Sequence, residues 1–238
     1  MKKLYRKEKY KTKTEWLKNR GFGGSSASAI FGVNPYMTKL DIYCASVNKN
    51  EIESDEDSNQ NDMTIYGQNA EPIIRELVKV NLAQRFRVQS PNGLTMYRRK
   101  DKPYMTATLD GLLIELLNGD RWILEIKTHE VRGEEDYLKW QGTLPINYAI
   151  QCLHYMATLN DTKGCLLVAK LRWVDYDTNE IIKEEIRYYW MPRQDYQDKI
   201  DEVERVETKF YENHIVKRIP PDVKCEFMEG EKNELQVE

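Results

Sequence analysis

The chain has 238 residues, of which 40% are hydrophobic and 32% charged, and its formal net charge is −3 at pH 7. This length fits one large α/β domain with a single core and requires no second domain. No apolar run approaches the ~18 residues that span a bilayer, and the lysine-rich start lacks the apolar stretch of a secretory signal, so we expect a soluble cytoplasmic protein with no membrane contact.

Basic residues are concentrated at the start of the chain. Residues 1–20 hold nine Lys and Arg against two Glu, a local charge of +7 that leaves −10 for the remainder. A basic arm over about residues 1–13 can contact phosphates and draw DNA toward a site, an attraction that salt weakens. The same composition suits a solvated, partly disordered tail, and both interpretations remain open.

A glycine-rich turn lies between short helices near the start. Three helices are expected in this part of the chain, at residues 14–19 (opening on a Thr cap), 25–31 and 39–47. The turn Gly21–Gly24 exposes backbone amides and leads into a helix amino terminus, where N–H groups and the helix dipole favour an anion such as phosphate. Arg20, Ser25 and Ser26 flank the turn and are candidate phosphate ligands. Simple helix capping is the alternative role for the two serines.

An acidic segment follows. Residues 51–62 contain six acids and no base, which predicts an exposed, flexible acidic loop over about residues 49–62. We assign this loop no catalytic role.

A long amphipathic helix is expected over residues 65–83, where apolar residues recur at helical spacing. Glu71 lies in its early turns, and Pro72 either kinks the helix or marks a later start. An exposed acid near a helix amino terminus gains about 0.3–1 kcal/mol from the macrodipole. The alternative role for the Glu71 carboxylate is to join a metal site, directly or through water.

The middle of the chain reads as strands. They are expected near residues 85–89, 94–98, 104–115 and 121–127. Within the third, residues 104–108 form a short strand that 112–116 continue, and Asn118–Asp120 form a tight turn into the fourth. Two antiparallel strands follow from this pattern, with Asp110 in the first.

Side chains in the fourth strand alternate between the two faces of the sheet. Glu125 and Lys127 lie two residues apart and therefore point to one face, while Leu124 and Ile126 point to the other. Mg²⁺ prefers carboxylate, carbonyl and water oxygens, which Asp110, Glu125 and the Ile126 carbonyl could supply. Lys127 could hold or help deprotonate an attacking water and stabilise charge on a phosphate. An ordinary solvated hairpin face is the alternative.

The last third alternates helices and strands. We expect helices at residues 135–140, 145–159 and 195–213, and a hairpin of strands at 164–174 and 181–191. Gln151 and Tyr155 share one face of the second helix because they lie four residues apart. Residues 220–238 open with two prolines and carry many charges, which predicts a polar tail. The order of elements predicts a central mixed sheet flanked by helices in one α/β domain.

Cysteine and histidine spacing indicates no metal cluster. The four cysteines form no Cys-x-x-Cys pair, which argues against zinc, iron–sulfur and disulfide frameworks. The three histidines form no local ligand pair, and we expect none of them to bind a metal.

Four sequence blocks, in order, resemble one family. The chain looks like a YqaJ-type viral recombinase, related to phage lambda exonuclease within the PD-(D/E)XK nucleases, over roughly residues 16–160. The blocks are 20–32, 66–72, 108–111 with 124–128, and 148–156. One departure is Leu109, where the family usually has proline; that residue shapes the turn and binds no metal.

The resemblance implies a restriction-endonuclease-like core and a set of site residues. It assigns Asp110, Glu125 and Glu71 to the metal site, with Lys127 in catalysis and Gln151 near the metal. It further implies that an arginine and a serine of the glycine-rich block hold the 5′-phosphate of a DNA end, together with a hydroxyl residue two before the catalytic Asp and a basic residue after the catalytic Lys. These positions correspond here to Arg20, to Ser25 or Ser26, to Thr108 and, with an offset of one, to Arg132.

The resulting expectation is a Mg²⁺-dependent exonuclease, with Mn²⁺ as a substitute, that digests double-stranded DNA from 5′ ends and leaves 3′ overhangs for recombination. The resemblance also implies a homo-oligomer such as a trimeric ring, a single-strand annealing protein as partner, and a phage or prophage origin in a bacterial host cell. Two alternatives remain: a structure-specific or nicking endonuclease, and a non-catalytic DNA-end binding recombination protein.

Overall fold

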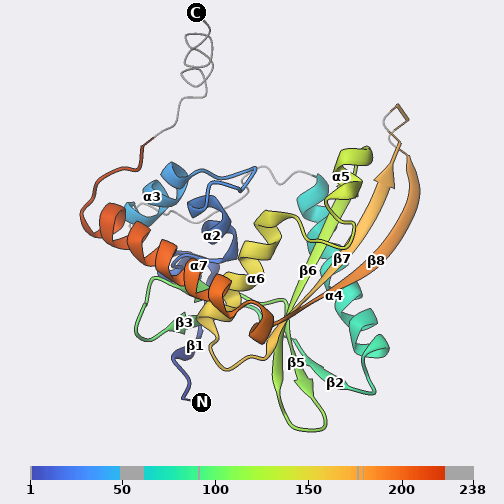
Figure 1. The fold of residues 1–238 in the computed structure, drawn as a ribbon, viewed down its shortest axis with the longest axis horizontal. Helices are drawn as coiled ribbons and strands as arrows, with labels where there is room; N and C mark the ends of the chain where they lie inside the picture. Colours follow the sequence, from blue (N-terminus) through green and yellow to red (C-terminus); the bar gives the residue numbers. More distant parts are fainter. Residues whose placement is uncertain (1, 49–61, 91, 176, 179, 223–238) are drawn as a thin grey trace, which may run out of the picture.

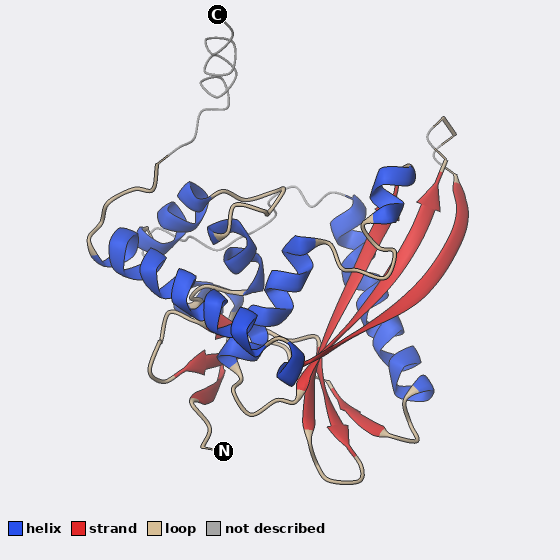
Figure 2. Cartoon of the chain, viewed as in Figure 1, coloured by secondary structure: helices blue, strands red, loops and turns tan. Residues whose placement is uncertain are grey.

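The structure is a computed structural model that describes residues 2–48, 62–90, 92–175, 177–178 and 180–222. These residues form a five-stranded sheet, a three-stranded sheet and the helices that cover them (Figures 1 and 2). The expected α/β class with helices around a central mixed sheet is therefore confirmed. The acidic loop, apart from Asp62, and most of the expected tail lie outside the described residues. No described helix is long and apolar enough to cross a membrane.

A five-stranded mixed sheet forms the centre of the fold. Its strands, in spatial order, are β2 (Phe86–Gln89), β5 (Gly111–Glu115), β6 (Arg121–Val131), β7 (Gly164–Val174) and β8 (Ile181–Pro192). Only β6 and β7 pair in parallel, and such a pair needs a crossover. Two helices between these strands supply it, α5 (Glu134–Leu138) and α6 (Ile146–Thr158). The first six residues of β7 are buried, as expected of a central strand covered on both faces.

Helices cover both faces of this sheet (Figure 1). On one face α4 (Asp62–Asn81) packs its buried apolar residues against Leu124 and Ile126 of β6. On the other face Gln151 of α6 contacts Glu125. The predicted alternation along β6 is therefore confirmed. The helix α4 begins well before Pro72 and continues through it, so Pro72 does not mark a later start.

The expected continuous strand over residues 104–115 is wrong. The chain instead forms β4 (Thr106–Ala107), which pairs with β3 (Thr95–Arg99), and then β5, which pairs with β6. Residues 108–110 carry the chain from the small sheet to the large one. This break places Asp110 immediately before the first residue of β5 rather than inside a strand.

The smaller sheet contains a strand that the sequence did not predict. Here β1 (Tyr5–Lys9) pairs antiparallel with β3, so this part of the basic arm is ordered on the body of the protein. The strand carries a single apolar residue, Tyr5, and alternation of apolar and polar residues could not reveal it. An ion pair between Glu8 and Arg98, at 3.0 Å, joins the two strands.

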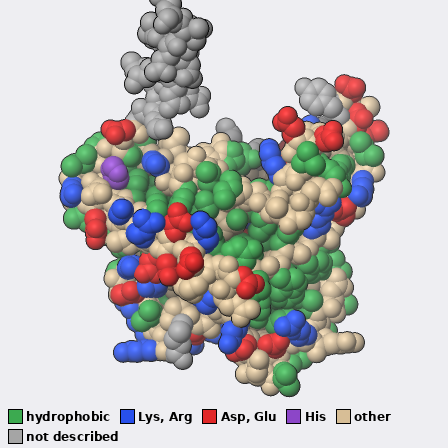
Figure 3. Space-filling view, in the orientation of Figure 1, with side chains coloured by type: hydrophobic (Ala, Val, Ile, Leu, Met, Phe, Trp, Pro, Cys, Tyr) green, Lys and Arg blue, Asp and Glu red, His purple; other side chains and the backbone are tan. Residues whose placement is uncertain are grey.

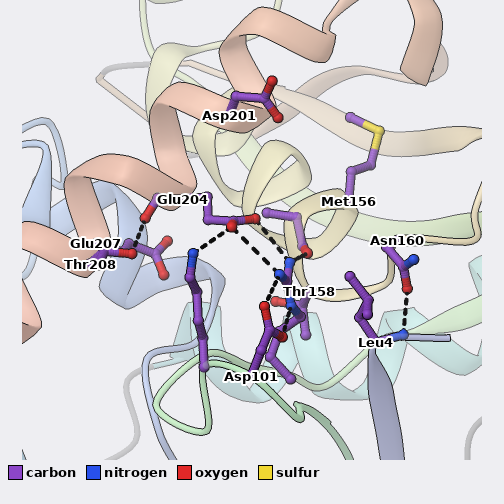
Figure 4. Close-up of polar contacts among 12 residues, drawn as sticks. Leu4, Asp101, Met156, Thr158, Asn160, Asp201, Glu204, Glu207 and Thr208 are labelled. Carbon is purple, nitrogen blue, oxygen red and sulfur yellow. Dashed lines mark hydrogen bonds and ion pairs between the residues drawn. The ribbon is translucent and has the colours of Figure 1, made fainter. Parts of the chain in front are cut away.

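The remaining helices form a lobe beside the large sheet (Figure 2). They are α1 (Lys13–Asn19), α2 (Gly24–Ile30), α3 (Lys39–Val47) and α7 (Gln197–Phe210). The expected helices are confirmed in position, although α1 is capped by Thr12 rather than Thr14. Arg99 and Lys102 bind Glu204 of α7 at 2.9 and 2.6 Å, which fixes α7 to the small sheet (Figure 4). Acidic and basic side chains are interspersed over this side of the molecule (Figure 3).

Candidate active site

The site begins at the edge of β6. Strand β5 pairs with β6 only as far as Leu124, so residues 125–131 have β7 along one edge and none of the described strands along the other. Asp110 lies at this open edge, and its Oδ2 accepts a hydrogen bond from the Ile126 N–H at 2.7 Å. A strand residue projects its N–H and C=O toward the same side. The Ile126 carbonyl therefore faces the same edge as the Asp110 carboxylate.

Glu125, which is buried, and Lys127, which is partly exposed, form an ion pair on the side of α6. The Lys127 Nζ lies 2.7 Å from Glu125 Oε1, and Gln151 Nε2 donates to the same oxygen at 2.6 Å. Glu125 is only 2% exposed, and its second oxygen, Oε2, has no hydrogen-bond partner among the described residues. A buried carboxylate oxygen without a partner carries a desolvation cost, which is a mark of a functional group or of a missing ligand.

Negative charge is crowded at this point. Burial, followed by the charge of Asp110, raises the pKa of Glu125 to about 8. Burial also raises the pKa of Asp110. Burial alone would lower the pKa of Lys127, but the carboxylates of Glu125 and Asp110 outweigh it and raise that pKa well above its ordinary value. Lys127 is consequently protonated in this site, and its single positive charge does not balance the negative charges of Glu125 and Asp110.

Glu71 of α4 lies in the groove that Asp110 and Lys127 also line. It forms an ion pair with Arg75, whose Nε also donates to the Asp110 carbonyl at 2.7 Å. Burial, followed by the charge of Asp110, raises the pKa of Glu71. The groove has a volume of about 290 Å³, and Glu71, Asp110 and Lys127 line it. We did not anticipate Arg75, although its position one helical turn after Glu71 was a signal for an ion pair.

The donor set fits a hard divalent cation with few protein ligands. In the part of the chain that the structure describes, no three Asp, Glu, His or Cys side chains gather closely enough to hold an ion by themselves. Two carboxylates, from Asp110 and Glu125, and the Ile126 carbonyl leave the remaining positions to water or substrate. Mg²⁺ is commonly bound in this way. The partnerless Glu125 oxygen supports the same assignment.

A close helix contact joins this site to the glycine-rich turn. A Cβ on Gly24, the first residue of α2, would lie 2.3 Å from Gln151 Cγ and 3.0 Å from Tyr155 Cζ. Gln151 also donates to the Tyr155 hydroxyl at 2.7 Å. Only glycine at residue 24 permits α2 to approach α6 this closely. The glycine pattern had suggested an open backbone for phosphate and not this packing contact.

The predicted phosphate ligands lie around a second pocket. A cavity of about 290 Å³ is lined by Arg20, Gly21, Ser25, Ser26 and by residues of α3. The Arg20 guanidinium lies over the Trp16 ring, 5.0 Å from its centroid. The residue that caps α2 is Gly23, which makes no side-chain cap bond, so helix capping does not account for the two serines.

Two predicted phosphate ligands lie outside both pockets. Thr108 falls in the break between the two sheets, and it lines neither cavity. Arg132 follows the end of β6, where it bonds Glu130 at 2.8 Å. Five residues of extended strand separate it from Lys127 by about 16 Å. The structure thus gathers Arg20, Ser25 and Ser26 but not these two residues.

The histidines make other contacts. His154 is fully buried and is hydrogen-bonded to Glu207 at 2.7 Å and to the Thr106 carbonyl at 2.8 Å. His129 bonds Asp136 at 2.8 Å, and His214 bonds the Ile219 carbonyl at 3.0 Å.

Comparison with solved structures identifies the fold. The chain is similar to the alkaline exonuclease LHK-Exo from Laribacter hongkongensis, with a TM-score of 0.51 and 15% identity over 86% of this chain and 96% of that one. The structure of LHK-Exo in complex with dAMP gives a TM-score of 0.52 at 13% identity, over 86% and 94% of the two chains. The expected restriction-endonuclease-like core is confirmed by this similarity.

Sequence comparison identifies the family. The chain is 22% identical over 151 residues to the uncharacterized protein YqaJ of Bacillus subtilis (strain 168), a match that covers 62% of this chain and 43% of that protein. The chain thus spans less than half the length of this relative. The sequence profile of the YqaJ-like viral recombinase domain matches residues 15–162, which include every site residue discussed above from Arg20 to Gln151. The chain therefore belongs to the YqaJ-like viral recombinase domain family.

Proposed function

We propose that the protein is a Mg²⁺-dependent exonuclease that hydrolyses double-stranded DNA from 5′ ends and leaves 3′ overhangs for recombination. The observation that supports it most is the Glu125 carboxylate, buried beside Asp110 and Lys127 with one oxygen unpartnered. The fold shared with an alkaline exonuclease and the membership of a viral recombinase family agree with nuclease activity.

The carboxylates of Asp110 and Glu125 and the carbonyl of Ile126 are the proposed metal ligands, with Glu71 joining through water. Mn²⁺, which accepts the same oxygen donors, is expected to substitute. A bound divalent ion would polarise the scissile phosphate and lower the pKa of an attacking water. Arg75 holds Glu71 and the Asp110 carbonyl in place, and Gln151 holds the Glu125 carboxylate.

Lys127 acts in this proposal as a fixed cation rather than as a proton acceptor. Burial alone would lower the pKa of Lys127, but in the metal-free site the charges of Glu125 and Asp110 raise it, which keeps the amine protonated at neutral pH. An ammonium group can orient a water through its hydrogen bonds and can offset the charge that develops on phosphate oxygens. It cannot accept a proton until it has first lost one. This protonation state supports charge stabilisation as the role that we assign to Lys127.

We assign the direction of digestion to the second pocket, which Arg20, Ser25 and Ser26 line. Arg20, Ser25 and Ser26 would hold the 5′-phosphate of the strand end, and renewed capture of each new 5′-phosphate would bias movement forward. Thr108 and Arg132 lie outside this pocket. We propose that they contact phosphates only when the bound DNA extends beyond it. The proposed partners are double-stranded DNA ends, further copies of the chain in a ring, and a single-strand annealing protein in a bacterial host cell.

Digestion of a labelled linear duplex with a 5′-phosphate, beside a covalently closed circle, tests the proposal. In Mg²⁺ the linear duplex should lose nucleotides from its 5′ ends while the circle remains intact. Release of label from 3′ ends alone would refute the polarity, and cleavage of the circle would instead indicate an endonuclease. Equal activity of Glu125→Ala and the parent would indicate a different site for cleavage or a non-catalytic DNA-end binding protein.

A further inference from the structure

The turn of residues 21–22 is held in place by the residues that lead into β4. The Phe22 N–H donates to the Tyr104 carbonyl at 2.6 Å, and the Phe22 carbonyl accepts from the Thr106 N–H at 2.8 Å. The Thr106 hydroxyl accepts from the Gly21 N–H at 3.1 Å and donates to the Phe22 carbonyl at 3.2 Å. A Cβ on residue 21 would overlap the Tyr104 carbonyl, so only glycine permits this approach. Both residues of the turn line the second pocket.

The Thr106 carbonyl is bound in turn by a buried histidine that the proposed reaction does not use. His154 Nε2 lies 2.8 Å from this carbonyl, and Nδ1 lies 2.7 Å from the Glu207 carboxylate of α7. Both oxygens accept hydrogen bonds, so each ring nitrogen donates one and the imidazole is a cation. Burial alone would lower the pKa of His154, but the Glu207 charge outweighs it and raises that pKa, in agreement with this state. Both side chains are 0% exposed, so water does not compete for either bond.

Helix α7 holds the residues that lead into β4 at two further points. Glu204 binds the Lys102 ammonium at 2.6 Å, and the Tyr104 hydroxyl donates to the Thr208 hydroxyl at 2.8 Å. Glu204, Glu207 and Thr208 share one face of α7 because they lie three and four residues apart (Figure 4). The backbone that holds the turn is therefore itself fixed to α7.

The position of the turn sets the geometry of the second pocket. Arg20 immediately precedes the turn, and α2, which carries Ser25 and Ser26, begins two residues after it. A shift of the turn would move the guanidinium relative to the two hydroxyls. Hydrogen bonds weaken steeply when their distance or angle departs from the optimum. A terminal phosphate monoester, with close to two negative charges and three free oxygens, depends on several such bonds at once.

We propose that His154 and Thr106 are positioning residues that set the preference for a 5′-terminal phosphate by fixing the turn of residues 21–22. This inference rests on the proposed function, in which the second pocket holds the 5′-phosphate. Neither residue touches the phosphate in this proposal. His154 fixes the backbone of Thr106, and Thr106 fixes the backbone between Arg20 and α2.

Paired duplexes test this role without cleavage. Binding of the full-length protein is measured by fluorescence anisotropy in Ca²⁺, which uses the same oxygen donors as Mg²⁺. The two duplexes differ only in their 5′-phosphate or 5′-hydroxyl ends, so the ratio of their Kd values isolates the terminal phosphate. The parent is compared with His154→Gln, with Thr106→Val and with the double variant. Thr162→Val is the matched control, because this buried hydroxyl bonds the Leu159 carbonyl at 2.9 Å.

Positioning predicts a loss that is specific to the phosphate. The parent should bind the 5′-phosphate duplex about tenfold more tightly, as expected for hydrogen bonds to a charged group. His154→Gln and Thr106→Val should each lower this ratio about fivefold and leave the affinity for the 5′-hydroxyl duplex unchanged. The double variant should lose less than the two separate effects predict, because both act through one turn. Thr162→Val should keep the parental ratio.

Several results would overturn the inference. They are a parent without a phosphate preference, an unchanged ratio in either folded single variant, and equal weakening for both duplexes, which a general loosening of the fold would cause. Circular dichroism establishes that each variant is folded. If His154→Gln does not fold, the ratio of Thr106→Val decides the outcome, since the hydroxyl can be removed without disturbing the buried ion pair.

Cleavage of a linear duplex by the parent in Mg²⁺ is scored separately. A parent that cuts, combined with unchanged ratios in the variants, rejects the positioning role and retains the nuclease. A parent that does not cut, combined with lowered ratios in the variants, rejects the nuclease and retains a terminal-phosphate site that His154 and Thr106 position.

Discussion

The Nζ of Lys127 and the Oε1 of Glu125 are 2.7 Å apart in a site where Glu125 is 2% exposed. The pair adjoins Asp110 and Glu71, so two cations, Lys127 and Arg75, lie among three acids. This imbalance underlies the first two predictions.

Replacing Lys127 with alanine should abolish most activity while DNA binding remains. Loss of one charged group that stabilises developing charge lowers kcat about 10²- to 10³-fold. Single-turnover cleavage of a linear duplex in Mg²⁺, with binding measured in parallel, separates the two effects. Arg75→Lys serves as a comparison, because it keeps a cation in the same groove. A Lys127→Ala enzyme with parental kcat would remove Lys127 from the chemistry.

Stability without metal should fall as the pH rises toward 8. The pKa of Glu125 in the fold is about 8, raised from an ordinary 4.5. Its contribution to stability is therefore complete below pH 4.5 and is lost as the pH rises through about 8. Thermal unfolding in EDTA should show this fall, and Glu125→Gln should flatten it. Mg²⁺ should raise the Tm of the parent at pH 8 but not that of Glu125→Gln; equal metal stabilisation of both proteins would contradict the assigned ligand.

Gly24→Ala should displace an active-site side chain, Gln151, although residue 24 itself lies outside the site. The new Cβ would lie 2.3 Å from Gln151 Cγ, which must move and release Glu125. Overpacking of this kind costs about 1–3 kcal/mol of stability. Combining it with Gln151→Ala removes the clashing atom, so the double variant should be more stable than the two separate losses predict. Urea unfolding measures this coupling, and strictly additive losses would show that α2 and α6 adjust without strain.

Glu207→Gln should destabilise the fold while leaving the groove intact. Glu207 and His154 are each 0% exposed and lie 2.7 Å apart. Burial alone would lower the pKa of His154, but the Glu207 carboxylate outweighs it and raises that pKa, so the two form a buried ion pair. Breaking such a pair by removing one partner costs about 3–5 kcal/mol. Chemical unfolding measures the loss, with the exposed Asp201→Asn on the same helix as a control that should change little. A Glu207→Gln protein as stable as the control would mean that the pair contributes nothing.

Several features followed from the sequence because they depend on neighbouring residues. Alternation along one strand fixes Glu125 and Lys127 on the same face whatever packs above them. The turn at Asn118–Asp120 sets the β5–β6 hairpin in a similar way. The long helix around Glu71 followed from apolar spacing alone.

Other features depended on contacts between distant segments. The sequence could not show that residues 108–110 cross between two sheets, because each short strand there is defined by its partner and not by its own pattern. The strand β1 went unpredicted for the same reason. Arg75 on the Asp110 carbonyl and Gly24 against Gln151 join residues that lie 35 and 127 positions apart. Local sequence thus determined which residue types face one another along a strand or a helix, whereas only tertiary packing decided which of them share a buried site, because burial and pairing depend on the whole chain.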